Sequence, residues 1–117
     1  MSPTLVFKGR QPIIALGAAG GPRIITTVLQ ELVAMLDHGK TPAEALAEPR
    51  FHHQWSPDEL VVEPAFPEAA LASLAGRGHR LKQEKALSVS QVVARSADRK
   101  SFAGAADPRS DGTAAGW

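Results

Sequence analysis

A glycine-rich break between an apolar run and a long helical pattern limits the folds open to this chain. The run covers residues 13–16, and the break reads Gly17-Ala18-Ala19-Gly20-Gly21-Pro22-Arg23. Apolar residues then recur at the spacing of one helical face: Ile25, Val28, Leu29, Leu32 and Leu36. We therefore expect a strand buried on both faces, a flexible turn over residues 17–21, and a helix that stops at Gly39.

Such a turn can have a chemical role as well as a structural one. A strand that leads directly into a helix leaves main-chain N–H groups unpaired at the helix start, where the helix dipole is positive. The adjacent glycines Gly20 and Gly21 let a ligand approach the backbone without obstruction. This pattern favours an oxyanion hole or a phosphate cradle, with a merely tight strand-to-helix turn as the alternative. The spacing matches neither a dinucleotide-binding fingerprint nor a Walker A loop.

The rest of the chain mixes strands and helices. Residues 5–7 predict a strand that pairs with the apolar run through a tight turn at Gly9-Arg10. A threonine, a proline and a glutamate at positions 41, 42 and 44 form a capping box, which should start a short helix that ends before Pro49. Further elements are expected as a strand at 60–63, a helix at 67–75 with Leu71 and Leu74 on one face, and strands around Leu81, at 89–94 and at 101–105. The tail from Ser110 is expected to be loose or to dock through Trp117.

Other polar residues are weaker candidates for chemistry. Adjacent His52 and His53 would face opposite sides of an extended segment, so we expect no metal site there. Asp107-Pro108-Arg109 is interpreted as a capped turn or a buried ion pair that holds the last strand to the sheet. After loss of the initiator methionine, Ser2 would carry the free α-amino group of an N-terminal nucleophile, but Pro3 restricts the backbone beside it.

Composition excludes several classes of function. With 117 residues, 44% of them hydrophobic, the chain is expected to form one globular domain. A net charge of +1 with scattered basic residues predicts no nucleic-acid partner, and the lack of cysteine excludes disulfides and thiolate metal sites. No apolar run approaches the roughly 20 residues that span a bilayer, and the start lacks a secretory signal. We expect a soluble chain, cytoplasmic as written, with no cofactor.

Five blocks of sequence, taken together, resemble the γ-glutamyltranspeptidase family. They lie in the family's order over nearly the whole chain, at residues 1–4, 17–30, 37–39, 48–55 and 104–109. The resemblance implies an α+β fold: part of the αββα sandwich of N-terminal nucleophile hydrolases, with two sheets flanked by helices. It also implies that residues 1–117 form a single segment, the C-terminal part of a small subunit. Complete family members are often periplasmic or extracellular.

The resemblance further implies a site. Family members cleave themselves to expose a threonine, which attacks a γ-glutamyl amide such as glutathione and passes the acyl group to water or an amine. The glycines that match Gly20 and Gly21 supply N–H groups to the oxyanion, so these two are the expected catalytic residues. The family's usual pattern differs at three positions, with Ser-Pro in place of Ala18-Ala19 and serine in place of Pro22.

The threonine nucleophile and the residues that bind the donor's α-amino group should belong upstream of Met1. We therefore expect this chain alone to be inactive, and to need a complementary upstream segment or to self-associate. The alternative is a stand-alone, non-enzymatic remnant that dimerises or binds an anion at the glycine turn.

Overall fold

The computed structural model describes residues 2–116, and for Ser2 the main chain only. The chain divides into two compact units. Unit 1 combines the residues up to Glu48 with those from Ser88 onward, and unit 2 is Pro49–Leu87. Within the described range, no helix is both long and apolar enough to cross a membrane. That residues 1–117 correspond to the C-terminal part of a small subunit stays a prediction.

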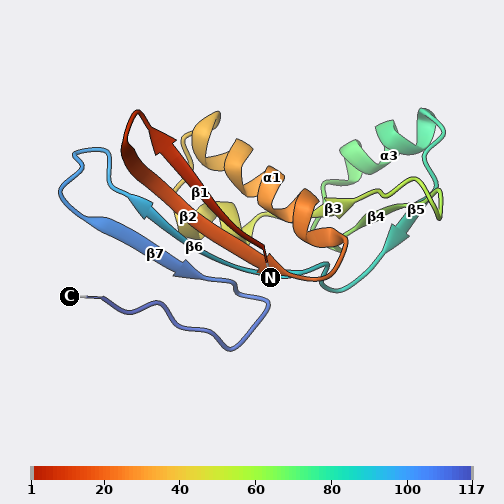
Figure 1. Cartoon of the computed structure of the whole chain (residues 1–117). Coiled ribbons are helices and arrows are strands. Elements are labelled where there is room, and N and C mark those ends of the chain that lie inside the picture. The colour runs from red at the N-terminus through yellow and green to blue at the C-terminus, as the bar shows by residue number, and fades with distance from the viewer. Residues whose placement is uncertain (1, 117) are drawn as a thin grey trace. The chain divides into compact units, whose positions relative to one another are not determined.

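Unit 1 is built on a four-stranded antiparallel sheet in the order β1-β2-β6-β7 (Figure 1). Its strands are β1 Ser2–Lys8, β2 Gln11–Ala19, β6 Val89–Arg95 and β7 Phe102–Ala106. The expected hairpin of the first two strands is confirmed, and its turn contains Gly9 at a φ of 63°. β2 also pairs with β6, which comes from the other end of the chain: Ile14 lies opposite Ala94.

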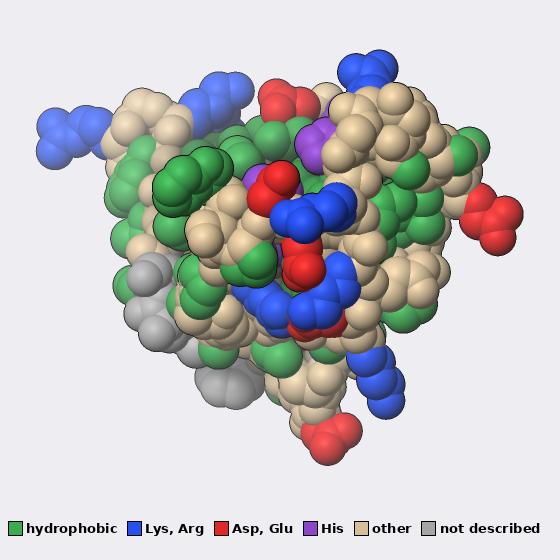
Figure 2. All heavy atoms as spheres, turned by 90° about the vertical axis from the view of Figure 1, so that its right-hand side faces the viewer, with side chains coloured by type: hydrophobic (Ala, Val, Ile, Leu, Met, Phe, Trp, Pro, Cys, Tyr) green, Lys and Arg blue, Asp and Glu red, His purple; other side chains and the backbone are tan. Residues whose placement is uncertain are grey.

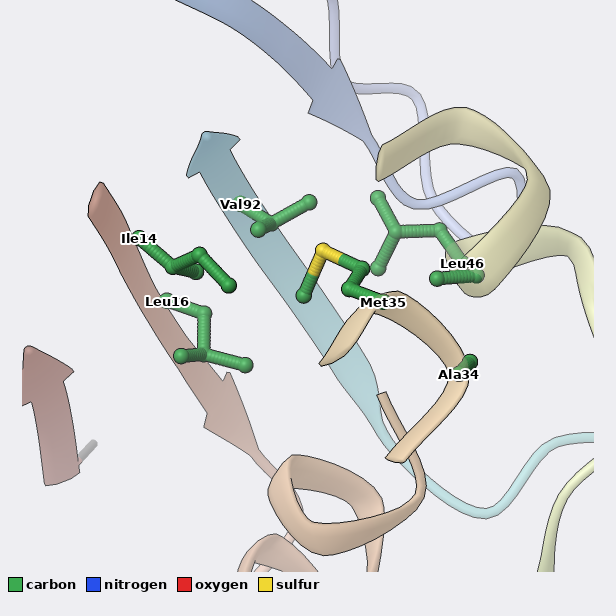
Figure 3. Packing of buried hydrophobic residues seen from close by; sticks show 7 residues of the cluster. Ile14, Leu16, Ala34, Met35, Leu46 and Val92 are labelled. Atoms are coloured by element: carbon green, nitrogen blue, oxygen red, sulfur yellow. The ribbon is translucent and has the colours of Figure 1, made fainter. Parts of the chain in front are cut away.

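Two helices, α1 Arg23–Leu36 and α2 Pro42–Ala47, pack on this sheet (Figure 1). In Figure 3, Met35 extends from α1 toward Ile14, Leu16 and Val92 on the strands, while Leu46 approaches from α2. Leu46 is fully buried and the others are nearly so. Burying a side chain of this size contributes about 1.5–3 kcal/mol, so this cluster is the main apolar core of unit 1.

The strand β2 is covered on one face along most of its length, and on the other face Gly17 is also buried. Ile14, Leu16 and Ala18 are buried, whereas Ala15 and Ala19 between and after them are exposed. The expectation that this strand is buried on both faces was wrong, because the core packs on one side. On the other side, the described part of the chain leaves an open groove of about 500 Å³, bordered by residues 113–115 of the tail.

α1 forms where the periodicity predicts it, but its buried face differs from the expected one. The residues that are buried are Thr27, Glu31, Ala34 and Met35. Of the expected face, Val28 and Leu32 are half-buried against the core, while Ile25, Leu29 and Leu36 are exposed. The helix is rotated because its polar residues bond to β6 and to the residue before it: Thr27 Oγ1 lies 2.5 Å from Ser88 Oγ, and Glu31 accepts from Ser90. A buried polar group with a hydrogen-bond partner is tolerated in a core.

The capping box that was predicted for α2 is confirmed. Thr41 Oγ1 accepts a hydrogen bond from the Glu44 N–H at 3.3 Å, and Glu44 Oε2 accepts from the Thr41 N–H at 2.8 Å. Pro42 occupies the first turn, and the helix ends before Pro49 as expected. Two main-chain donors that the helix cannot use are thereby satisfied.

Unit 2 contains a three-stranded sheet in the order β3-β4-β5. Its elements are β3 Phe51–His52, β4 Leu60–Val62, α3 Glu68–Gly76 and β5 Leu81–Gln83. β4 and β5 are parallel and are joined through α3, while β3 is antiparallel to β4. The sequence predicted all of these except β3, which has only two residues and therefore no alternation to recognise.

Candidate functional site

The glycine-rich segment turns later than the sequence suggested. β2 continues to Ala19, so the flexible turn that was expected over residues 17–21 is wrong for its first three positions. Each of these three residues pairs with a residue of β6, which keeps them extended. The turn itself consists of residues 20–22, directly before the first residue of α1.

Gly20 and Gly21 both adopt backbone conformations that favour glycine. Their φ angles are 155° and 60°, in the region that side chains rarely enter. Both residues are exposed. Apart from Gly21 and its chain neighbours, a Cβ atom built on Gly21 would meet no heavy atom of the structure within 4 Å, so the space on the Cβ side of this residue is open.

Some main-chain N–H groups at this turn donate to main-chain carbonyls, and others do not. The N–H groups of Arg23 and Ile24 donate to the carbonyls of Gly20 and Gly21, both at 3.2 Å. Pro22, the N-cap residue of α1, has no N–H, and no side chain caps the helix. Neither glycine N–H donates to a main-chain carbonyl within residues 2–116. Two adjacent donors therefore lie at the positive end of the helix dipole, an arrangement suited to a negative charge.

A buried polar network adjoins the strand that leads into this turn. Ser90 is fully buried, and its Oγ lies 2.7 Å from Glu31 Oε2 and 3.2 Å from the Gly17 carbonyl. Its N–H donates to Asp107 Oδ2 at 2.8 Å. The sequence analysis did not identify Glu31 or Ser90. The only available signal was an isolated acid within the apolar stretch 28–36, which also suits an exposed position.

Asp107 and Arg109 have the structural role that the sequence predicted. Asp107 is fully buried, and its Oδ1 accepts from both the N–H and the guanidinium of Arg109, at 3.0 and 3.1 Å. The same guanidinium donates to the carbonyls of Leu46 and Glu48 at 2.6 and 2.7 Å. These contacts join the end of β7 to the C-terminal end of α2. They use charge-assisted hydrogen bonds, which are among the stronger ones in proteins.

The two adjacent histidines of unit 2 point into different surroundings, as expected. His52 is buried, and its Nε2 lies 2.9 Å from Gln54 Oε1. His53 is half-exposed, and its Nε2 lies 3.2 Å from Asp58 Oδ1. In the part of the chain that the structure describes, no three His, Asp or Glu side chains gather closely enough to hold a metal ion.

Acidic and basic side chains are interspersed on the face shown in Figure 2. In unit 2, Lys82 lies between Glu59 and Glu84, with Nζ to oxygen distances of 3.7 and 3.4 Å, and Arg80 lies near Asp58. Paired charges of this kind do not form the basic stripe that neutralises a phosphate backbone.

Two interpretations from the sequence fall outside what the structure describes. The nucleophile hypothesis for Ser2 depends on its side chain, and the docking hypothesis for the tail depends on Trp117. Both stay predictions.

Comparison with known proteins gives concordant results. The family model described as Gamma-glutamyltranspeptidase matches residues 1–117. The "Glutathione hydrolase proenzyme" of Escherichia coli (strain K12) is 44% identical over 118 residues, which cover 100% of this chain and 20% of that protein. The chain thus spans about a fifth of the length of this curated relative.

Solved structures are also similar. The T380A mutant of Helicobacter pylori γ-glutamyltranspeptidase matches with a TM-score of 0.87 at 34% identity, covering 94% of this chain and 61% of that one. A cephalosporin acylase from Bacillus halodurans matches with a TM-score of 0.89 at 31% identity, covering 98% of this chain and 22% of that one.

Proposed function

Because the chain belongs to the γ-glutamyltranspeptidase family, we propose that it supplies the oxyanion hole of an enzyme that transfers or hydrolyses γ-glutamyl groups. Its fold is α+β and is part of the αββα sandwich of N-terminal nucleophile hydrolases. The observation that carries the proposal is that Gly20 and Gly21 are exposed residues whose N–H groups donate to no main-chain carbonyl within residues 2–116.

In the proposed reaction, a threonine outside this chain attacks the carbonyl carbon of a γ-glutamyl amide such as glutathione. The carbonyl oxygen then becomes an oxyanion, and the N–H groups of Gly20 and Gly21 donate to it. Donors that are already oriented need no rearrangement as the charge develops, so they stabilise the transition state more than the substrate. Pro22, at a position where serine is common in the family, contributes neither a hydroxyl nor an N–H, so the two glycines carry this role.

The proposed partner is a complementary segment that covers the open face of the unit 1 sheet. Leu5, Val93 and Phe102 are 59%, 44% and 66% exposed there. They alternate along their strands with Val6, Val92 and Ala105, which contact the core on the opposite face. An apolar sheet face of this kind is normally buried against a second layer.

A chimera tests the catalytic role. This chain would replace the matching 118 residues of the E. coli proenzyme, and release of amine from a γ-glutamyl anilide would be measured. Replacing Gly21 with valine forces a β-branched residue into a positive φ and obstructs the approach of the carbonyl. Loss of one such donor lowers kcat by about 10²- to 10³-fold, and KM should change much less.

Gly39→Val is a matched control. Gly39 has a φ of 66° and equally open space around a built Cβ, so the substitution imposes similar backbone strain beyond the C-terminal end of α1, away from the turn. It should lower thermal stability as Gly21→Val does but leave kcat near the parent value. A Gly21→Val chimera with parental kcat would show that the turn is only a tight connection. The isolated chain should hydrolyse no γ-glutamyl amide, and activity that depends on Ser2 would contradict the proposal.

A further inference from the structure

One serine hydroxyl lies within hydrogen-bond distance of the segments on both sides of the Gly20-Gly21 turn, and its single proton is donated to one of the two acceptors at a time. Ser90 Oγ lies 3.2 Å from the carbonyl of Gly17, near the end of β2, and 2.7 Å from Glu31 Oε2, two turns into α1. The turn has no side-chain cap of its own, and its glycines have the freest backbones of any residue type. Its geometry therefore depends on how firmly the strand and the helix beside it are fixed.

We infer that Glu31 and Ser90 are positioning residues for the oxyanion donors, an inference that rests on the proposed function of Gly20 and Gly21. The main-chain N–H of Ser90 donates to Asp107 Oδ2 at 2.8 Å, so the serine itself is held by a second carboxylate. Glu31, Ser90 and Asp107 are each at most 1% exposed, which shields these bonds from competition with water.

The choice of a carboxylate at position 31 follows from its surroundings. Its helix neighbours Ala34 and Met35 pack in the apolar core, a setting in which an apolar side chain would be expected at position 31. A buried carboxylate costs desolvation energy, and the hydrogen bond from Ser90 offsets part of that cost. What leucine cannot provide is an acceptor that fixes the rotation of α1 relative to β6. That rotation sets the direction of the helix start at Arg23 and Ile24, and with it the position of the turn at residues 20–22 directly before it.

Hydrogen exchange on the chain as it exists tests the inference without any catalytic assay. The amides of Arg23 and Ile24 report on the turn, since they donate to the carbonyls of Gly20 and Gly21. Ser90→Ala or Glu31→Leu should accelerate their exchange about tenfold more than that of amides in the last turn of α1. Glu31→Gln, which keeps an acceptor oxygen, should restore most of the protection.

Ile14→Val provides the matched control, because Ile14 is buried in the same unit but lies six positions before the turn. This substitution should change protection evenly along α1, if it changes protection at all. If Ser90→Ala and Glu31→Leu also accelerated hydrogen exchange to the same extent along the whole of α1, the inference would be overturned, because the network would then contribute only general stability.

The E. coli chimera gives the second measurement. Ser90→Ala and Glu31→Leu should lower kcat by about 10- to 100-fold with little change in KM, because misplaced donors act on the transition state. Glu31→Gln should recover kcat, and Ile14→Val should keep it. If Gly21→Val loses kcat while Ser90→Ala keeps it, the positioning role fails and the oxyanion role stands. If Gly21→Val keeps kcat, the oxyanion role fails, and the exchange data alone decide whether Ser90 orders the turn.

Discussion

Glu44 links the start of a helix to the pH dependence of stability. Hydrogen bonds from the main chain and then the side chain of Thr41 lower the pKa of Glu44 below its ordinary value of 4.5. A carboxyl group whose pKa is lower in the folded state stabilises the fold above its unfolded pKa and loses that contribution as pH falls through the folded pKa. Acidification from about pH 5 to pH 3 should therefore weaken α2.

We predict that Glu44→Gln flattens the acid side of the stability profile, measured as the urea midpoint at several pH values between 7 and 3. Glu68→Gln is a suitable control, because Glu68 occupies the first turn of α3 without a capping box. Both variants remove one negative charge, but only Glu44→Gln also alters a capping box. Equal slopes for the two variants would contradict the prediction.

At the level of elements, α1 presents apolar residues on both sides. Met35 is buried in the core, whereas Leu29 is 58% exposed. Met35→Ala should destabilise unit 1 by about 2–5 kcal/mol through lost burial and a residual cavity. Leu29→Ala should change stability by less than about 0.5 kcal/mol, because its side chain is mostly in solvent. Urea unfolding followed by circular dichroism would compare the two, and a larger loss in Leu29→Ala would contradict the observed helix rotation.

The elements themselves were largely predictable from sequence, since hydrophobic spacing, glycine breaks and the Thr41 capping box are local signals. The rotation of α1 was not predictable in the same way. Periodicity favoured Ile25 and Leu29 as core residues, yet Thr27 and Glu31 are buried because Ser88, directly before β6, and Ser90 in β6 provide hydrogen-bond partners. Those partners are about 60 residues away in the sequence, a separation at which local patterns carry no information.

In the candidate site, too, some features were predictable from local sequence and others depend on residues far away in the chain. The sequence identified Gly20 and Gly21 from their position between strand and helix, whereas the network of Glu31 and Ser90 became visible only with the sheet pairing. The turn was placed too early, at Gly17, because glycine and alanine have low strand propensity. Pairing with β6 overrides that preference over residues 17–19.

For the whole molecule, we predict that the isolated chain self-associates through the open face of the unit 1 sheet. Leu5→Lys combined with Val93→Lys should shift sedimentation toward the monomer, because buried lysines without partners are costly. Leu29→Lys is the control: it places the same charge on an exposed apolar position of α1. A parent chain that stays monomeric at high concentration would contradict the prediction, and dissociation caused by Leu29→Lys alone would assign the contact to the helix.

The order of the strands in unit 1 has a consequence for how the chain is made. β1 and β2 precede unit 2 in the sequence, but β6, which pairs with β2, follows the whole of unit 2. During synthesis, β2 and Glu31 therefore lack their partners in β6 until residues 89–95 have been made. Closing so long a loop is slow compared with forming a helix or a hairpin. Before Ser90 is available to join strand and helix, the edge of β2 is unpaired, and an unpaired edge of this kind favours aggregation.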